Sequence, residues 1–386
     1  MSTSEPFDWA QAGADMPRVQ APCPHFGVCG GCRLQDLSYP DQLNLKEGRL
    51  RALFASLPPR RRLPPLAGPP LAYRTRLRFS VKNVPKKGGM LVGFHEKKKR
   101  YIVDMRECPI LPDRVSRLIG PLRGLVSGLS LTRALPQISV SAAENQDAYV
   151  FRVMENPTED DLALLAAFEA EHRIRIYLQT GGYETIRPLN PGAPLDLTYS
   201  LRDHALTIHY RPHHFTQVNL PVNEAMARQA LELLKIQKGG KGLDLFCGVG
   251  NFTLVLARAG ARVWGYDSEG DQIESARGNA SSNRLSDRAV FEAADLYTET
   301  GVKAVDFTGV EFALLDPPRT GALEVCRAIP GDGPRRLLYI SCNPETLSRD
   351  AEVLVKEKGY RLEALGLVDM FPQTLQAEAM AFFEIQ

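Results

Sequence analysis

From about residue 221 onward, short apolar runs alternate with stretches of helical pattern, and this alternation constrains the fold more than any other feature of the chain. The apolar runs are GLDLF, RVWGY, FALLD and RLLYIS, separated by helical stretches of ten to fifteen residues. Strands that alternate with helices form βαβ units, whose parallel strands make one sheet with helices on both faces. The sequence therefore predicts an α/β fold with a doubly wound, Rossmann-like parallel sheet in this half.

The first predicted strand ends in a glycine turn that opens a helix, with glycines at Gly248 and Gly250, and the next strand ends at Asp267. Such glycines let the backbone approach an adenosyl ligand, and an acid at the second strand tip accepts hydrogen bonds from ribose hydroxyls. A dinucleotide site would have a third glycine near position 253, where this chain has Thr253. The pattern thus favours a cofactor without phosphates, S-adenosylmethionine, and Asp295 after the third strand is placed to bind its adenine amino group.

The next two strands end in polar motifs that face the same crevice. Asp316 is followed by Pro317-Pro318-Arg319, a rigid polar corner suited to holding the edge of a planar base. The following strand ends in Ser341-Cys342-Asn343-Pro344. Because ligands bind outside the carboxyl ends of such strands, Cys342 is placed as a nucleophile, whereas Cys247 and Cys326 read as buried structural cysteines.

Several motifs, in this order, resemble those of the RNA uracil-5-methyltransferases across the whole catalytic half: Phe215-x-Gln217-x-Asn219, DLFCGVGNF, DPPR, SCNP and DMFPQT-x-x-x-Glu378. The resemblance implies that the Cys342 thiolate adds to uracil C6, so that C5 can attack the methyl group of S-adenosylmethionine. It further implies that Glu378 is the general base that removes the C5 proton.

The same resemblance assigns further roles by motif position. Asp316 and Gln217 are expected to contact cofactor and target base, and the cofactor positions are Phe246, Gly248, Asn251, Asp267 and Asp295. The chain departs from the family at Gln376, where a histidine is usual. We expect activity to survive this change, because Gln can still form hydrogen bonds.

Four further cysteines suggest a metal site: Cys23, Cys29 and Cys32 in a glycine-rich stretch, and Cys108 directly before a proline. Seven cysteines in a chain with no recognisable export signal favour thiolate chemistry over disulfides. Four thiolates with a proline after the last suit a [4Fe–4S] cluster, and zinc is the alternative, with His25 able to replace one ligand. The resemblance strengthens the cluster prediction, since a subgroup of the family carries it.

Basic charge is concentrated between residues 46 and 106, which hold seventeen Lys and Arg against three Asp and Glu. This surplus is consistent with RNA binding or with a solvated face, and Arg74, Arg76 and Arg78 alternate as a phosphate-tracking strand would. Residues 57–70 hold six prolines and are expected to form a linker or long loop, and the chain that follows them is rich in predicted strands: RLRFSV, MLVGFH, RYIVDM, QISVSA, AYVFRVM, IRIYLQT and ALTIHYR. The interleaved aromatics Tyr73, Phe79, Phe94 and Tyr101 are expected mostly in the core.

These features predict a flexible tail at residues 1–20, a β-rich RNA-binding domain with the cluster at 21–210, and the methyltransferase domain at 211–386. By resemblance the target is 23S rRNA, as in shorter enzymes without an accessory amino-terminal barrel, and tRNA is the alternative. Cytosine C5 methylation and a non-catalytic RNA-binding factor also remain open. We expect a cytosolic protein, with no membrane contact and no implied protein partner.

Overall fold

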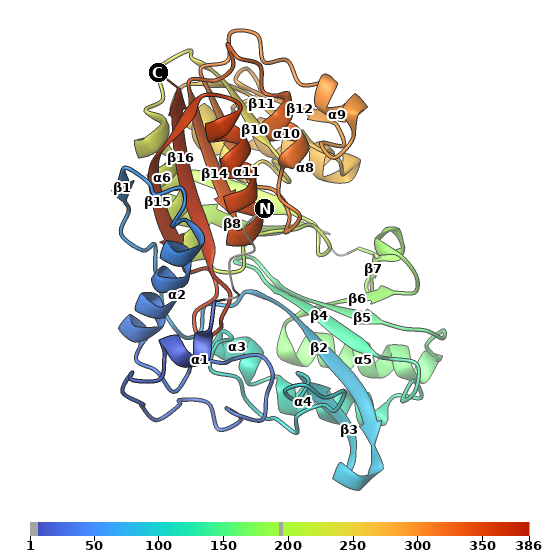
Figure 1. Cartoon of the computed structure of the whole chain (residues 1–386). Coiled ribbons are helices and arrows are strands. Elements are labelled where there is room, and N and C mark those ends of the chain that lie inside the picture. The colour runs from blue at the N-terminus through green and yellow to red at the C-terminus, as the bar shows by residue number, and fades with distance from the viewer. Residues whose placement is uncertain (1–6, 193–195, 386) are drawn as a thin grey trace.

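The computed structural model describes residues 7–192 and 196–385 and contains two main sheets, one above the other in Figure 1. The larger sheet has eight strands in the order β1-β15-β16-β14-β13-β10-β11-β12. The smaller has six in the order β3-β2-β4-β5-β6-β7, and β8 and β9 form a separate hairpin. No helix in the described part of the chain is long and apolar enough to cross a membrane.

Five strands of the larger sheet run parallel, with helices on both faces, which confirms the predicted doubly wound fold. These strands are β10 (Lys241–Leu245), β11 (Arg262–Asp267), β12 (Ala289–Ala293), β13 (Phe312–Leu315) and β14 (Arg336–Ser341). The helices are α6 (Leu220–Leu234), α7 (Asn251–Arg258), α8 (Gly270–Ser282), α9 (Glu299–Lys303), α10 (Leu323–Ala328) and α11 (Pro344–Lys356). Three helices, α7, α9 and α10, have eight, five and six residues and are shorter than predicted.

The sheet is not parallel throughout, and this corrects the prediction. Strand β16 (Glu378–Ile385) runs antiparallel to both β14 and β15 (Tyr360–Val368). The loop between β15 and β16, residues 369–377, is too short for the crossover that a parallel pair requires, so the chain turns back as a hairpin. The proline-rich stretch at residues 57–70 supplies only a two-residue edge strand, β1 (Arg61–Arg62), which pairs with β15.

The smaller sheet is formed by β2 (Arg76–Val84), β3 (Gly89–Gly93), β4 (Gln137–Ala142), β5 (Asp147–Arg152), β6 (Arg175–Gln179) and β7 (Arg187–Pro188). Helices α3 (Asp113–Ser116), α4 (Ile119–Gly128) and α5 (Glu159–His172) accompany it, and the 3₁₀ turns of the chain are Pro85–Lys87, Tyr183–Thr185 and Arg202–His204. The predicted strand RYIVDM was wrong, because this segment has only one isolated bridge, between Ile102 and His95.

The hairpin of β8 (Leu197–Leu201) and β9 (Leu206–Tyr210) packs against helices of the larger sheet, α7 and α8. Its apolar side chains share a core with α6 and α7, and the Asn279 side chain on α8 exchanges two hydrogen bonds with the backbone of His209 on β9. The predicted division at residue 210 stays a prediction. The residues just before this boundary, in the β8–β9 hairpin, contact the helices of the larger sheet.

The amino-terminal segment lies beside both sheets and carries α1 (Trp9–Ala12) and α2 (Tyr39–Leu53), the latter in contact with α11 and β15 (Figure 1). Residues 1–6 of the predicted flexible tail lie outside the described residues, and its flexibility stays a prediction. Phe7, Trp9 and Met16 pack against a small core made by Leu34, Leu37 and Leu45.

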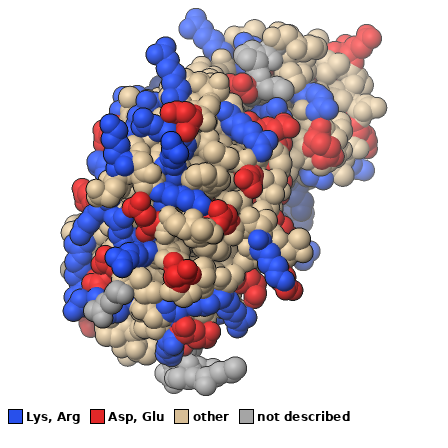
Figure 2. All heavy atoms as spheres, turned by 90° about the horizontal axis from the view of Figure 1, so that it is seen from above, with Lys and Arg blue, Asp and Glu red and all other residues tan. Residues whose placement is uncertain are grey.

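The end of the molecule that is seen from above carries charges of both signs (Figure 2). On the end of the molecule seen in Figure 2, Lys and Arg are interspersed with Asp and Glu. Arg76 does not follow the predicted phosphate-tracking role: its guanidinium donates to the Pro212 carbonyl at 2.7 Å and lies 5.8 Å from the centre of the Tyr210 ring. Arg78 is exposed on the same strand and stays available to a ligand.

Candidate active site

The structure gathers all nine predicted cofactor and catalytic residues around one pocket of about 540 Å³. The pocket opens at the carboxyl ends of β10, β11, β13 and β14, where open α/β sheets bind ligands. The residues are Gln217, Phe246, Gly248, Asn251, Asp267, Asp295, Asp316, Cys342 and Glu378. This convergence joins segments up to 161 positions apart, from Gln217 to Glu378, and leaves their individual roles as predictions.

Asp267, the acid predicted to bind the ribose of the cofactor, is hydrogen-bonded to the glycine turn. The Gly248 amide donates to Asp267 Oδ2 at 2.9 Å, and the Glu269 amide donates to Oδ1 at 3.1 Å. The turn has positive φ at three places, 69° at Phe246, 53° at Gly248 and 90° at Gly250. The value at Phe246 is the strained one, because a bulky side chain rarely adopts this conformation. The strain lies where the backbone must bend around a ligand.

Asn251 has a different neighbourhood from the one that the sequence suggested. Its Oδ1 accepts from the Tyr199 hydroxyl at 2.8 Å and from Asn223 Nδ2 at 2.9 Å, while its Nδ2 donates to Asn223 Oδ1 at 3.0 Å. The side-chain oxygen Oδ1 of Asn251 therefore already accepts two hydrogen bonds. Asn251 joins the cofactor side of the pocket to α6 and to the β8–β9 hairpin.

The catalytic side of the pocket contains a thiol and two carboxyl groups that influence one another. Burial, and then the Asp244 carboxylate, raise the pKa of Asp316 to about 7, while Gln217 Nε2 donates to Asp316 Oδ2 at 3.2 Å and opposes the shift. Burial and Asp316 raise the pKa of Glu378 to about 8. Burial, Glu378 and Asp316 together raise the pKa of the Cys342 thiol to about 11. Positive charge entering this pocket would lower all three values.

Sequence reasoning missed Asp244, a buried acid whose charge acts on Asp316, and the role of Arg319, which lines the pocket. Asp244 in β10 is fully buried, accepts from the Thr253 hydroxyl at 2.5 Å, and has an oxygen without a hydrogen-bond partner; burial raises its pKa to about 7. An acid between Leu243 and Leu245 in a buried strand was the signal that could have identified it. Arg319 also lines the pocket and lowers the pKa of both Cys342 and Glu378.

The histidine pair before the Gln217 motif, His213 and His214, has a positioning contact. His213 Nε2 and His214 Nε2 lie 2.6 and 3.0 Å from Asp271 Oδ2 in α8. The Arg211 amide donates to His214 Nδ1 at 3.2 Å, so His214 carries its proton on Nε2 and donates it to Asp271. The pair attaches the segment before Gln217 to the helix that follows Asp267.

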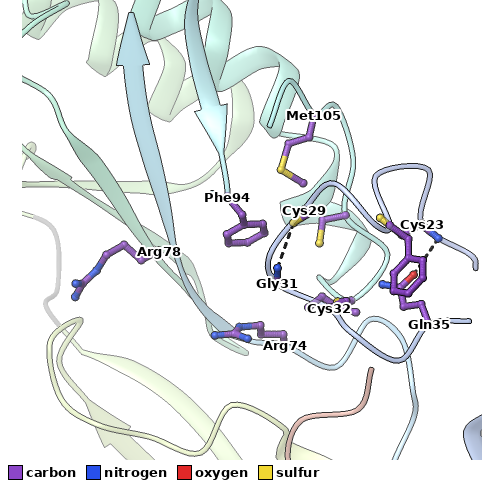
Figure 3. Close-up of a pocket in the computed structure, with 12 residues that line it drawn as sticks. Cys23, Cys29, Gly31, Cys32, Gln35, Arg74, Arg78, Phe94 and Met105 are labelled. Carbon is purple, nitrogen blue, oxygen red and sulfur yellow. Dashed lines mark hydrogen bonds between the residues drawn. The ribbon is translucent and has the colours of Figure 1, made fainter. Parts of the chain in front are cut away.

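The four amino-terminal cysteines line a second pocket (Figure 3). Cys23, Cys29 and Cys32 come from the amino-terminal loop and Cys108 from the segment before α3, and all four are free thiols. Arg74 and apolar side chains, including Phe94 and Met105, complete the wall. The Gly31 amide donates to Cys29 Sγ at 3.5 Å.

Burial is the largest influence on these thiols and raises the pKa of each, to about 11 for Cys32 and about 12 for Cys108. Of the aromatics between the basic clusters, Tyr73 and Phe79 are buried as expected and Phe94 is partly buried, whereas Tyr101 is exposed.

Comparisons with known proteins agree with this geometry. The family model described as tRNA (uracil-5-)-methyltransferase matches residues 38–385. The 23S rRNA (uracil(1939)-C(5))-methyltransferase RlmD of Acidithiobacillus ferrooxidans is 46% identical over 373 residues, covering 95% of this chain and 84% of that protein. The protein of the same name from Nitrosospira multiformis is 43% identical over 387 residues, covering 98% and 88%.

Among solved structures, the tRNA (uracil-54, C5)-methyltransferase of Pyrococcus abyssi, in complex with S-adenosyl-L-homocysteine, superimposes with a TM-score of 0.72. The superposition covers 92% of this chain and 86% of that one at 24% sequence identity, and shows that the two share a fold. The match of the family model over most of the chain, with the two relatives above 40% identity, confirms the resemblance found in the motifs. The chain belongs to the tRNA (uracil-5-)-methyltransferase family.

Proposed function

We propose that the protein is an S-adenosylmethionine-dependent methyltransferase that forms 5-methyluridine in 23S rRNA, acting in the cytosol. The observation that carries the proposal is the convergence of Cys342, Asp316 and Glu378 on the pocket that also holds the predicted cofactor residues. The names of the relatives with 43 to 46% identity favour 23S rRNA as the substrate. S-adenosylmethionine, when bound, supplies an electrophilic methyl group on a positively charged sulfur.

The proposed reaction begins at Cys342. Uracil C5 is too weak a nucleophile to take a methyl group unaided, so the thiolate forms a bond to C6, and the electron pair of the C5–C6 double bond becomes available at C5. The new C5–methyl bond would use this pair, while the bond between the methyl group and the cofactor sulfur would break and leave its electron pair on that sulfur. Because the thiol pKa is about 11, Cys342 must lose its proton to a neighbour before it attacks, and Glu378 and Asp316 are the carboxyl groups whose charges act on it.

Glu378 is the proposed base for the second half of the reaction. It takes the proton from C5, the electron pair re-forms the C5–C6 double bond, and the bond between C6 and the Cys342 sulfur breaks. The target must be unstacked to reach a pocket of this depth, as is general for enzymes that modify a base. Asp316, held by Gln217, is suited to orient the base through its polar edge.

A pH prediction follows from Glu378. Only its carboxylate can accept the proton, and a pKa of about 8 leaves roughly one tenth of it ionised at pH 7. The rate of adduct breakdown is therefore expected to rise by about tenfold between pH 7 and pH 9. Single-turnover rates over this range test it, and a profile that is flat from pH 6 upward would contradict a raised pKa.

We propose that the second pocket holds a [4Fe–4S] cluster through Cys23, Cys29, Cys32 and Cys108. Four free thiols around one cavity fit such a cluster, and Arg74 offers positive charge to offset its thiolates. Zinc held by four thiolates, with Zn–S bonds of about 2.3 Å, is the alternative occupant. The cluster's proposed role is architectural.

Replacing Cys32 with serine tests the metal site. We expect iron and acid-labile sulfide to fall from about four atoms of each per chain to well below one, with loss of visible absorbance. Cys326→Ser, at a buried cysteine on α10, is the matched control and should keep its iron. Stoichiometric zinc without sulfide in the anaerobically purified parent protein would refute the cluster.

The reaction itself can be tested with RNA transcripts labelled with tritium at C5 of uridine. Methylation at C5 releases this tritium into water, whereas cytosine methylation leaves it in place. We expect release from a 23S rRNA fragment that depends on S-adenosylmethionine, and none from tRNA. Release from tRNA alone would overturn the proposed substrate, and binding without release from any transcript would favour the non-catalytic RNA-binding factor.

A further inference from the structure

The helix α2 carries an unusual stripe of buried and half-buried polar side chains. Tyr39, Gln42 and Lys46 are spaced three and four residues apart and so lie on one face of the helix. Gln42 and Lys46 are fully buried, and the exposed Asn44 lies on another face. Buried faces of helices are normally apolar, because a desolvated polar group is costly unless it is paired. The partners of this stripe therefore indicate its purpose.

Apart from the Leu37 carbonyl, which accepts from Gln42 Nε2 at 3.1 Å, the partners described here belong to the loop between β15 and β16, residues 369–377, which leads directly into Glu378. Lys46 Nζ donates to Asp369 Oδ1 at 2.5 Å and to the Phe371 carbonyl at 3.0 Å. The Tyr39 hydroxyl donates to Asp369 Oδ2 at 2.9 Å. Lys46 and Asp369 are both fully buried, so this ion pair fixes the start of the loop.

Gln373 is the second attachment point. Gln42 Nε2 donates to the side-chain oxygen Oε1 of Gln373 at 2.9 Å. The backbone N–H of Gln373 donates to Gln42 Oε1, also at 2.9 Å. The backbone of Gln373 has a φ of 71°, a value that residues other than glycine rarely adopt. Such a conformation persists when the surroundings determine it, and the paired amides are part of those surroundings.

The cysteine loop holds the same residue. The amides of Arg33 and Leu34 both donate to the Gln373 carbonyl, at 2.9 and 3.1 Å. These two amides directly follow Cys32, a proposed cluster ligand. One residue, five positions before Glu378, is therefore hydrogen-bonded both to α2 and to the chain that leaves the cysteine pocket.

We propose that Gln42 and Lys46 are positioning residues for Glu378, and that Gln373 couples the cysteine pocket to the proton-removal step. The inference rests on the proposed function, because it deepens the role of Glu378. The metal site would thereby support the base that completes the reaction, in addition to shaping the RNA surface. Addition of Cys342 and methyl transfer precede proton removal and depend less on this loop.

This order of steps gives the proposal a kinetic signature. If the loop shifts, proton removal slows while the adduct still forms, so covalent protein–RNA adduct accumulates. We expect Gln42→Met, which keeps the side-chain length but loses both hydrogen bonds to Gln373, to lower kcat by about tenfold to a hundredfold with little change in KM. The adduct fraction at steady state should rise severalfold on a denaturing gel.

The matched control is Asn44→Ala, on the exposed face of the same helix. It should leave kcat, KM and the adduct fraction unchanged. Iron content and melting temperature show whether Gln42→Met is folded. A folded Gln42→Met protein whose loss is confined to KM, or whose adduct fraction equals that of the parent, would overturn the positioning role.

The coupling to the cysteine pocket has a readout that requires no turnover. Hydrogen–deuterium exchange of the parent protein is measured with its iron present and after chelation, in the peptide that spans residues 369–377. We expect faster exchange there after iron removal, while a peptide from β10 stays unchanged. Unchanged exchange in both peptides would refute the coupling. If tritium release fails with every RNA, the proposed function fails, while the exchange result still reports on the loop.

Discussion

Glu378→Gln is expected to stop the reaction after methyl transfer and to leave the protein covalently joined to its RNA. The amide cannot accept the C5 proton, so the bond between Cys342 and uracil C6 cannot break by elimination. Loss of a general base typically costs about 10²- to 10⁴-fold in rate. Incubation with S-adenosylmethionine and labelled RNA, followed by a denaturing gel, should show a slow-migrating band that contains both protein and the transferred methyl group.

The control for this experiment is Gln376→Ala, two residues away and exposed. Its side chain takes the place of the histidine that is usual in the family, and we expect turnover without trapped adduct. Rapid release of methylated RNA by Glu378→Gln would contradict the assignment of the base and favour Asp316, the other carboxyl group whose charge raises the pKa of Cys342.

Cys342→Ala should abolish methylation and adduct formation together. Without the thiolate, C5 does not gain the electron density that it needs, and loss of a catalytic nucleophile costs on the order of 10⁴- to 10⁶-fold. RNA affinity should stay within about twofold, because alanine removes a small side chain from the end of the pocket. Filter binding and methyl incorporation, measured side by side, separate these effects.

Cys326→Ala serves as the comparison, since Cys326 is buried in α10 and outside the pocket. It should retain activity. Full methylation by Cys342→Ala would refute covalent catalysis, whereas loss of RNA binding in the same variant would show that the substitution disturbs the surface.

Much of the fold was predictable because its signals are local. Runs such as RVWGY and RLLYIS are apolar over the length of a buried strand and became β11 and β14. RYIVDM has similar residues but finds no partner beyond the bridge at Ile102, and pairing is not visible in a single segment. The direction of β16 likewise depends on the length of a loop.

The candidate site was predictable where a motif follows a strand end, as at Asp316 and Cys342, because topology brings such ends together. Contacts across long stretches of sequence were not predictable. Lys46 pairs with Asp369, 323 positions away, and the two-way amide pair of Gln42 and Gln373 spans 331. In the sequence, Lys46 counted only as part of the basic surplus, although its side chain is fully buried.

The proposed function can be decided by mass spectrometry of nucleosides from a strain that lacks this gene and from its parent, with RNA fractionated into tRNA and ribosomal RNA. We predict loss of 5-methyluridine from the large-subunit RNA fraction, restored by the parent gene and not by the gene carrying Cys342→Ala. Unchanged 5-methyluridine in that fraction would contradict the proposed substrate, and no change in any fraction would contradict the proposed reaction.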